Sequence, residues 1–254
     1  MPARPDTIRR LDQLLFARGL CDSREQAKRL IMAGRVRHFG QVAKKASDPA
    51  APDDEVEIVE GEKYVSRGGL KLEHALDHFQ IDPSGVRAVD IGASTGGFTD
   101  CLLQRGAKSV HAVDVGKGQL AWALRRDHRV TVMEKTNARY LKPAKMAGDF
   151  HSADLITIDC SFISLQKILP PAFSLTKKNG NIIALVKPQF EAGKIEADKG
   201  SGVISDPAVH ERVLHELEVF VDATTDSRWR GVTTSPLKGP AGNTEFLAWI
   251  EKTA

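Results

Sequence analysis

Two kinds of segment alternate along most of this chain, from Gly68 to the C-terminus. Short apolar runs suited to burial on both faces of a sheet occur at 86–91, 109–115, 130–133, 155–158 and 182–186. Amphipathic segments with helical spacing lie among them, at 72–79, 97–104, 120–124 and 213–221. This alternation predicts βαβ units, and therefore an α/β fold with a mainly parallel sheet.

The end of the chain departs from this alternation. Residues 230–234 and 245–250 have the pattern of two strands, and the loop SPLKGPAGN joins them. A closing hairpin places an antiparallel strand at the edge of the sheet. The strictly parallel sheet of Rossmann dehydrogenases lacks this feature, whereas the seven-stranded, Rossmann-like sheet of class I methyltransferases has it. The pattern favours the second of these sheets.

A glycine-rich loop, DIGASTGGF at 90–98, lies between a predicted strand and a predicted helix. A glycine turn there lets a ligand approach the backbone closely at the carboxyl edge of the sheet. Asp114, 22 positions after Gly92, is placed to accept both hydroxyls of a ribose. An NAD site usually has a glycine where this chain has Ser94. Asp90 instead suits a ligand with a cationic amino-acid tail, which describes S-adenosylmethionine.

We therefore expect S-adenosylmethionine as the cofactor. Asn137, just beyond the third strand, is placed to contact its adenine, although an Asn there can also cap a turn. The residues expected to bind the cofactor are Asp90, Gly92, Ala93, Ser94, Gly96, Gly97, Asp114, Val115, Asn137 and Asp159.

The N-terminal part is a different kind of sequence. Residues 1–45 hold eleven Lys and Arg against four acids, whereas residues 46–62 hold seven acids and no Lys or Arg. A first helix is expected around Ile8, Leu11 and Leu15, a second after Ser23 with Gln26 completing a capping box, and strands at 35–39 and 56–59. We expect a small domain at 1–60, a linker at 61–66 and the α/β domain at 67–254.

A basic surface of this size is typical of contact with a polyanion, although charge alone is equally consistent with a solvated face. The phosphate backbone of a folded RNA fits it, because phosphate contacts position a protein without reading sequence. The residues expected to contact RNA are Arg10, Arg24, Lys28, Arg29, Arg35, Lys44 and Lys45. The string RRLDQLLFARGLCDSREQAKRLIMAGRVRHFGQ resembles the αL RNA-binding module first known from a small-subunit ribosomal protein, with His38 at a usually apolar strand position.

Two lysines and two carboxylates are candidates for catalysis. Asp159 and Lys187 each follow a predicted strand, Glu245 opens the last strand, and Lys71 lies on the leading helix. A ribose hydroxyl is a poor nucleophile, and a lysine made neutral by nearby cations and partial desolvation can remove its proton. The carboxylates would hold the lysines in place. Methylation of an exocyclic amine or a ring carbon asks for other groups, Asn-Pro-Pro-Tyr/Phe or a catalytic Cys, and Cys160 lacks the Pro-Cys context.

The segments SRGGLKL, DIGASTGGFTD, AVDVGKGQLAW, TNAR, DCSFISL, VKPQFEAGK and SPLKGPAGNTEF together resemble the TlyA family of ribosomal RNA methyltransferases, historically also called hemolysins. The catalytic part also resembles the FtsJ-type 2′-O-ribose methyltransferases. Their Lys-Asp-Lys-Glu tetrad corresponds to Lys71, Asp159, Lys187 and Glu245. The resemblance implies Lys187 as the general base, the other three as orienting groups, and cytidine 2′-hydroxyls of ribosomal RNA as substrates.

Other classes of protein fit less well. No run approaches the roughly 20 apolar residues of a membrane helix, and the basic start without an apolar stretch predicts no secretory signal. We expect a cytoplasmic location, reduced cysteines, no metal at the His74/His78 pair and no membrane partner. A cytolysin, and an RNA-binding ribosome assembly factor with a vestigial cofactor site, are the alternatives. The loop 191–206 is a candidate lid or an ordinary loop, and the oligomeric state is open.

Overall fold

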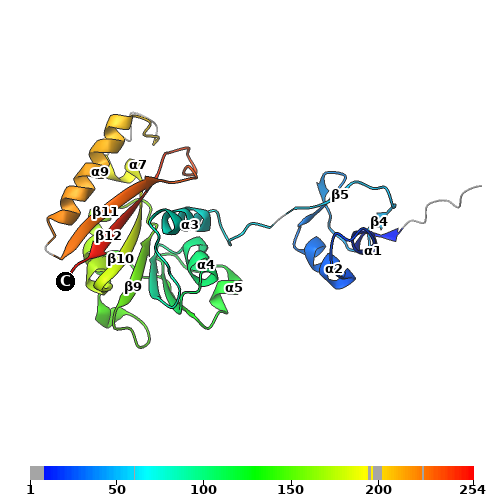
Figure 1. The fold of residues 1–254 in the computed structure, drawn as a ribbon, viewed down its shortest axis with the longest axis horizontal. Helices are drawn as coiled ribbons and strands as arrows, with labels where there is room; N and C mark the ends of the chain where they lie inside the picture. The colour runs from blue at the N-terminus through cyan, green and yellow to red at the C-terminus, as the bar shows by residue number, and fades with distance from the viewer. Residues whose placement is uncertain (1–8, 60, 194–195, 197–201, 225) are drawn as a thin grey trace, which may run out of the picture. The chain divides into compact units, whose positions relative to one another are not determined.

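The computed structural model describes residues 9–59, 61–193, 196, 202–224 and 226–254 (Figure 1). Ile8, expected at the start of the first helix, and part of the loop 191–206 lie outside the described residues. The chain divides into two compact units, Met1–Glu62 and Lys63–Ala254.

The small unit packs two helices against short strands. Its elements are β1 (Arg9–Arg10), α1 (Leu11–Ala17), α2 (Arg24–Met32), β2 (Val36–His38), β3 (Gln41–Val42), β4 (Pro49–Ala50) and β5 (Val56–Ile58). The order β3-β2-β5 makes an antiparallel sheet, and β1 pairs with β4. Half of the predicted capping box of α2 is present: Ser23 Oγ accepts from the backbone amide of Gln26 at 3.2 Å, but Gln26 Oε1 accepts from the backbone amide of Asp22 and not from that of Ser23. Leu11, Leu15 and Ile31 are at the centre of the core.

The large unit is built on a seven-stranded sheet in the order β11-β12-β10-β9-β6-β7-β8. The strands are β6 (Arg87–Ile91), β7 (Ser109–Val113), β8 (Val130–Met133), β9 (Ala153–Ile158), β10 (Thr176–Val186), β11 (Ser227–Thr234) and β12 (Phe246–Lys252). Six of them point in the same direction, and β12, which lies between β10 and β11, is antiparallel to both. The predicted sheet and its closing hairpin are therefore confirmed.

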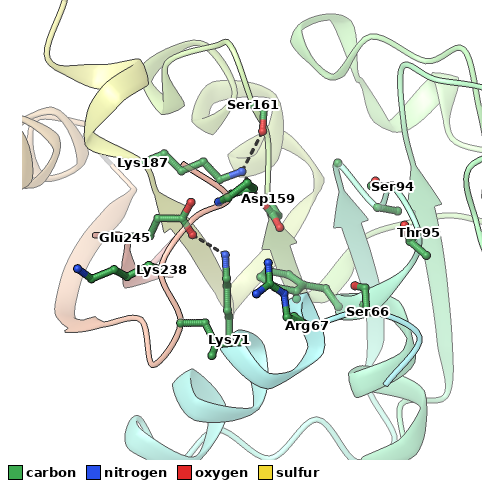
Figure 2. Close-up of a pocket in the computed structure, with 17 residues that line it drawn as sticks. Ser66, Arg67, Lys71, Ser94, Thr95, Asp159, Ser161, Lys187, Lys238 and Glu245 are labelled. Carbon is green, nitrogen blue, oxygen red and sulfur yellow. Dashed lines mark hydrogen bonds and ion pairs between the residues drawn. The ribbon is translucent and has the colours of Figure 1, made fainter. Parts of the chain in front are cut away.

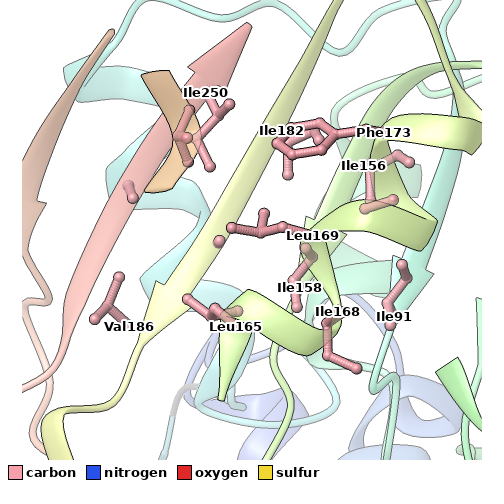
Figure 3. Packing of buried hydrophobic residues seen from close by; sticks show 14 of the residues in the cluster. Ile91, Ile156, Ile158, Leu165, Ile168, Leu169, Phe173, Ile182, Val186 and Ile250 are labelled. Carbon is pink, nitrogen blue, oxygen red and sulfur yellow. The ribbon is translucent and has the colours of Figure 1, made fainter. Parts of the chain in front are cut away.

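Helices cover both faces of this sheet. They are α3 (Gly68–His78), α4 (Gly97–Gln104), α5 (Trp122–Arg125), α6 (Leu169–Leu175), α7 (Pro188–Glu191) and α9 (Pro207–Asp222), with 3₁₀ turns η1 (Ala138–Tyr140), η2 (Pro143–Lys145) and η3 (Leu165–Lys167). Side chains alternate along each strand. In β10, Ile182 packs in the core beneath α6 and α9 (Figure 3), whereas its neighbour Ile183 packs in the core beneath α3 and α4.

The structure corrects three expectations. The linker expected at 61–66 is shorter, because Tyr64 is buried in the core beneath α3 and belongs to the large unit. The helix expected through Leu120 is the single turn of α5, and Leu120 lies before it. The strand expected to reach Val115 ends at Val113, so Asp114 is the first residue beyond β7.

Candidate active site

Four ionisable side chains from distant parts of the chain meet at the carboxyl edge of the parallel strands (Figure 2). Lys71 comes from α3, Asp159 follows β9, Lys187 follows β10, and Glu245 directly precedes β12. All four line a cavity of about 270 Å³, here named the lysine cavity, whose wall also includes Arg67, Ser161 and Lys238. The structure thus brings together the four candidates that the sequence indicates.

The four groups form two ion pairs. Lys71 Nζ lies 2.5 Å from Glu245 Oε2, and Lys187 Nζ lies 2.5 Å from Asp159 Oδ1. Both lysines are only 9% exposed, and Glu245 is 1% exposed. The desolvation cost of burying an ion pair is about as large as the attraction between its charges. A gain in fold stability is therefore a weak explanation for this arrangement. A cluster of buried, paired charges in a cavity is instead a mark of a functional site.

Ser161 is a site residue that the sequence analysis missed. Lys187 Nζ donates a hydrogen bond to Ser161 Oγ at 3.0 Å. The only signal in the sequence is its position, two residues after Asp159 at the same strand end. A serine in a loop is too common for that spacing to single it out.

A second cavity adjoins the first and is here named the Asp114 cavity. Its volume is about 560 Å³, within the range typical of small-molecule sites. Its lining includes Asp114, Val115 and Asn137, and it shares Gly92, Ser94, Asp159 and Ser161 with the lysine cavity. A ligand can therefore extend from one cavity into the other along the glycine-rich loop.

Backbone amides orient the Asp114 carboxylate. Its Oδ2 accepts from the Ser94 amide at 2.8 Å, and its Oδ1 accepts from the Gly116 amide at 2.7 Å. Each carboxylate oxygen keeps a further lone pair for a ligand hydroxyl. Asn137 lines the same cavity, and its Oδ1 caps η1 by accepting from the Arg139 amide at 3.1 Å. Both roles considered for Asn137 are therefore open to it.

Gly92 determines how closely the turn after β6 can pack against the end of β9. Its φ is +85°, and a Cβ at this position would overlap the backbone carbonyl oxygen of Asp159. The turn after β6 therefore lies directly against the end of β9. A cradle of this kind, with Asp114 on one side and the paired lysines on the other, fits a nucleoside joined to a reacting centre.

The structure does not bring Asp90 or Gly96 to either cavity. Asp90 is fully buried, and its carboxylate accepts from Thr99 Oγ1 at 2.7 Å and from Thr157 Oγ1 at 2.9 Å. These two hydroxyls, from α4 and β9, hold it inside the fold beneath the loop. Gly96 turns the chain into α4 with φ +101° and packs against Leu120 and Leu124. The other predicted cofactor residues line one or both cavities: Gly92, Ala93, Ser94, Gly97, Asp114, Val115, Asn137 and Asp159.

Two other candidate groups do not have the surroundings that catalysis or metal binding needs. Cys160 lines the Asp114 cavity, but burial raises the pKa of its thiol to about 12, which disfavours the nucleophilic thiolate. His74 Nε2 lies 3.2 Å from Thr233 Oγ1. Within the described ranges, no group of three or more potential ligands could hold a metal ion.

The predicted RNA contacts of the small unit differ in how free their charges are. Arg10 and Arg24 both contact the buried carboxylate of Asp12, at 3.0 and 3.4 Å. Burial acts to raise the pKa of Asp12, but the hydrogen bonds from the two arginines outweigh it and hold that pKa below its usual value. Arg10 and Arg24 therefore stabilise the small unit itself.

The remaining predicted contacts are more available to a ligand. Lys28 Nζ lies 2.6 Å from Glu25 Oε1, and Arg35 Nε donates to the Val59 carbonyl oxygen at 3.2 Å. Arg29, Lys44 and Lys45 are exposed, and none of them forms an ion pair with another described residue. These three are the exposed predicted contacts without an ion pair, and Arg35, whose partner is a backbone carbonyl, also keeps its positive charge.

Comparison with known families agrees with the division of the chain into a small and a large unit. The model of the S4 domain family matches residues 9–56, and that of the FtsJ-like methyltransferases matches residues 64–252. The chain belongs to the FtsJ-like methyltransferase family. In this FtsJ-like chain, the matched segment contains both cavities and all four members of the charged cluster.

Similar proteins cover nearly the full length of this FtsJ-like chain. YqxC of Bacillus subtilis, provisionally named an rRNA methyltransferase, is 48% identical over 94% of this chain and 84% of its own. The 16S/23S rRNA (cytidine-2′-O)-methyltransferase TlyA of Mycobacterium tuberculosis is 44% identical over 95% of this chain and 89% of its own. A solved Streptococcus thermophilus structure with a hemolysin name has a TM-score of 0.73 and 44% identity, covering 97% of this chain and 89% of its own.

The burial of Asp90 generates a prediction about pH. Burial raises the pKa of Asp90 to about 6, although the hydrogen bonds from Thr99 and Thr157 oppose the shift. A carboxyl whose pKa is higher in the folded than in the unfolded protein destabilises the fold as pH rises from about 4 to about 6. Because Asp90→Asn cannot ionise, the free energy of unfolding of the wild type, relative to this variant, should fall by roughly 2 kcal/mol between pH 4 and pH 7.

Urea unfolding of both proteins at several pH values measures this difference, and the other carboxyl groups cancel in the comparison. Asp154→Asn serves as the control: partial burial acts to raise the pKa of Asp154, but the contacts with Lys177 and Arg87 outweigh it and leave that pKa lowered. Its difference from the wild type should change in the opposite direction. A wild-type minus Asp90→Asn difference that does not vary with pH would contradict the assignment.

Proposed function

We propose that this chain transfers a methyl group from S-adenosylmethionine to the 2′-hydroxyl of a cytidine in ribosomal RNA. The observation that carries the proposal is the two Lys–carboxylate contacts of buried lysines in the lysine cavity, which shares part of its wall with the Asp114 cavity. The name of the Mycobacterium tuberculosis relative supports the choice of ribose oxygen and nucleotide.

The Asp114 cavity fits the donor. S-adenosylmethionine would supply an electrophilic methyl group on a positively charged sulfur. Asp114, held by two backbone amides, keeps lone pairs for the hydroxyls of the donor's ribose. Asn137 lies on the wall of the same cavity, where it could contact the adenine. Because Gly92 has no side chain, the donor can pass along the loop towards Asp159.

Lys187 is the proposed general base. It lies at the end of β10 in the lysine cavity, where Asp159 fixes its Nζ from the strand end beside it. As the target oxygen forms its bond to the methyl carbon, its proton passes to Nζ. Lys71 is held by Glu245 in the same cavity, and the two would orient the target ribose.

The S4 unit is proposed to hold the ribosomal RNA. Exposed Arg29, Lys44 and Lys45 would contact phosphates, and Lys28 and Arg35 lie on the same small unit. Ribosomal RNA as a substrate implies a cytoplasmic enzyme. No helix in the described part of the chain is both long enough and apolar enough to cross a bilayer.

The base assignment can be tested by Lys187→Ala. Loss of a general base should lower the rate of methyl transfer by roughly 10²–10⁴-fold. Donor binding should change little, because the Asp114 cavity is intact. Transfer of radiolabelled methyl groups to ribosomal RNA measures the rate, calorimetry with S-adenosylhomocysteine measures binding, and mass spectrometry locates the modified ribose.

Lys177→Ala is a matched control. Lys177 lies near the start of β10, whereas Lys187 directly follows the other end of this strand. Lys177 contacts Asp154 at 2.6 Å, so its loss should leave transfer unchanged. Normal turnover by Lys187→Ala would reject the base assignment. Lysis of liposomes by the wild-type protein without any methyl transfer would favour the cytolysin hypothesis instead.

The RNA-binding role can be tested with the triple variant Arg29→Ala, Lys44→Ala, Lys45→Ala. Each phosphate contact that is lost should reduce the salt slope of RNA binding by about 1. Affinity for ribosomal RNA should therefore fall at low salt and depend less on salt concentration. Filter binding at several potassium chloride concentrations measures both quantities.

The control for this variant is Lys177→Ala with Lys178→Ala, which removes positive charge from β10 in the large unit. It should leave the salt slope unchanged. An unaltered slope in the triple variant would show that these side chains do not contact phosphates.

A further inference from the structure

One contact of Lys187 has no role in the reaction described so far. Its Nζ donates to Ser161 Oγ at 3.0 Å, in addition to the ion pair with Asp159 Oδ1 at 2.5 Å. A protonated lysine has three N–H donors, so an amine that has lost one proton keeps two N–H bonds and a single lone pair. Ser161 Oγ engages one of these N–H bonds in the structure. Asp159 Oδ1, a buried oxygen 2.5 Å from Nζ with no hydrogen-bond partner of its own, is the acceptor to which the other can turn, which leaves the lone pair for an incoming hydroxyl.

We propose that Ser161 is a positioning residue that aims the lone pair of Lys187 at the target 2′-hydroxyl. Without Ser161, the amine would be held by Asp159 alone and could rotate about its terminal carbon–nitrogen bond. This inference rests on the proposed function, because it assigns the detailed geometry of the same base.

The location of Ser161 suits this role. Ser161 and Asp159 line both the lysine cavity and the Asp114 cavity, whereas Lys187 lines the lysine cavity alone. Figure 2 shows Ser161 and Asp159 approaching the lysine amine from the strand end beside it. The two groups that hold the amine therefore lie on the side of the lysine cavity that faces the proposed donor site.

Contacts beyond the site hold the Ser161 loop against the segment that follows Lys187. The Leu165 amide donates to Glu191 Oε1 at 2.8 Å, and the rings of Phe162 and Phe190 lie 4.9 Å apart between centroids. Phe162 has a φ of +61°, a backbone conformation that a residue with a bulky side chain rarely adopts unless its surroundings impose it. Because Phe190 and Glu191 closely follow Lys187, these contacts couple the positions of the hydroxyl and the amine.

The proton balance is consistent with this role. Lys187 first releases one proton to solvent. The ribose O–H bond then breaks and its proton joins the neutral Nζ, while the oxygen–carbon bond forms and the carbon–sulfur bond of the donor breaks. The resulting ammonium has three N–H bonds, which can be directed at Asp159, Ser161 and the methylated oxygen. Ser161 accepts a hydrogen bond before and after transfer and never loses its own proton.

The test compares Ser161→Ala with Ser161→Thr in single-turnover and steady-state methyl transfer. Loss of one hydrogen bond to the amine should lower kcat by about tenfold. The KM for donor and for RNA should stay the same, because Ser161 aims the base without binding either substrate. Threonine retains the hydroxyl and should recover most of the lost rate.

Ser164→Ala is the matched control in the same loop. Ser164 Oγ accepts from the Gln166 amide at 3.2 Å and caps η3, so this variant perturbs the loop without touching Lys187. It should leave kcat close to that of the wild type. An equal loss of kcat in Ser164→Ala, a normal kcat in Ser161→Ala, or no recovery by threonine would overturn the proposal.

An independent measurement reports on the contact without catalysis. In protein labelled with ¹⁵N-lysine, the Lys187 ammonium signal, assigned by its absence in Lys187→Ala, should exchange with water several-fold faster in Ser161→Ala than in the wild type. Unchanged exchange would overturn the proposal. Absence of ribose methylation by the wild type would instead reject the proposed function, so the two failures are distinguishable.

Discussion

Charge compensation in the lysine cavity is the constraint on which the rest of this structure depends. Two lysines can be buried at the sheet edge only because each has a carboxylate within contact distance. Parallel strands bring their carboxyl ends to one edge, which accounts for Asp159 and Lys187. An antiparallel strand begins at that edge, so the reversal of β12 brings Glu245 to the same place. The closing hairpin therefore completes the site as well as the sheet.

Much of this arrangement could be predicted from the sequence because it depends on local patterns. The strand β8 and the helix α4 have the predicted bounds, and all four members of the charged cluster meet as expected. The prediction failed where long-range packing decides the outcome. Tyr64 belongs to the large unit because α3 covers it, and Asp90 lies away from both cavities because hydroxyls from α4 and β9 enclose it. Spacing along a chain does not reveal such enclosure.

The same reasoning applies to the S4 unit. A count of positive charges treats its basic residues as equivalent. In the structure, however, Arg10 and Arg24 form ion pairs with the buried Asp12 and so stabilise the small unit. Arg29, Lys44 and Lys45 have no such partner among the described residues. The strength of an electrostatic surface therefore depends on which charges are already neutralised, and only the three-dimensional pairing shows that.

The contact between the turn at Gly92 and the main chain at Asp159 has a consequence for how this enzyme can vary. Any side chain at position 92 would push the two strand ends apart and so disturb the lining of both cavities at once. Under the proposed function, a substitution of Gly92 would therefore change donor affinity and the rate of methyl transfer together. Substitutions that change only one of these two properties are expected at residues that line a single cavity.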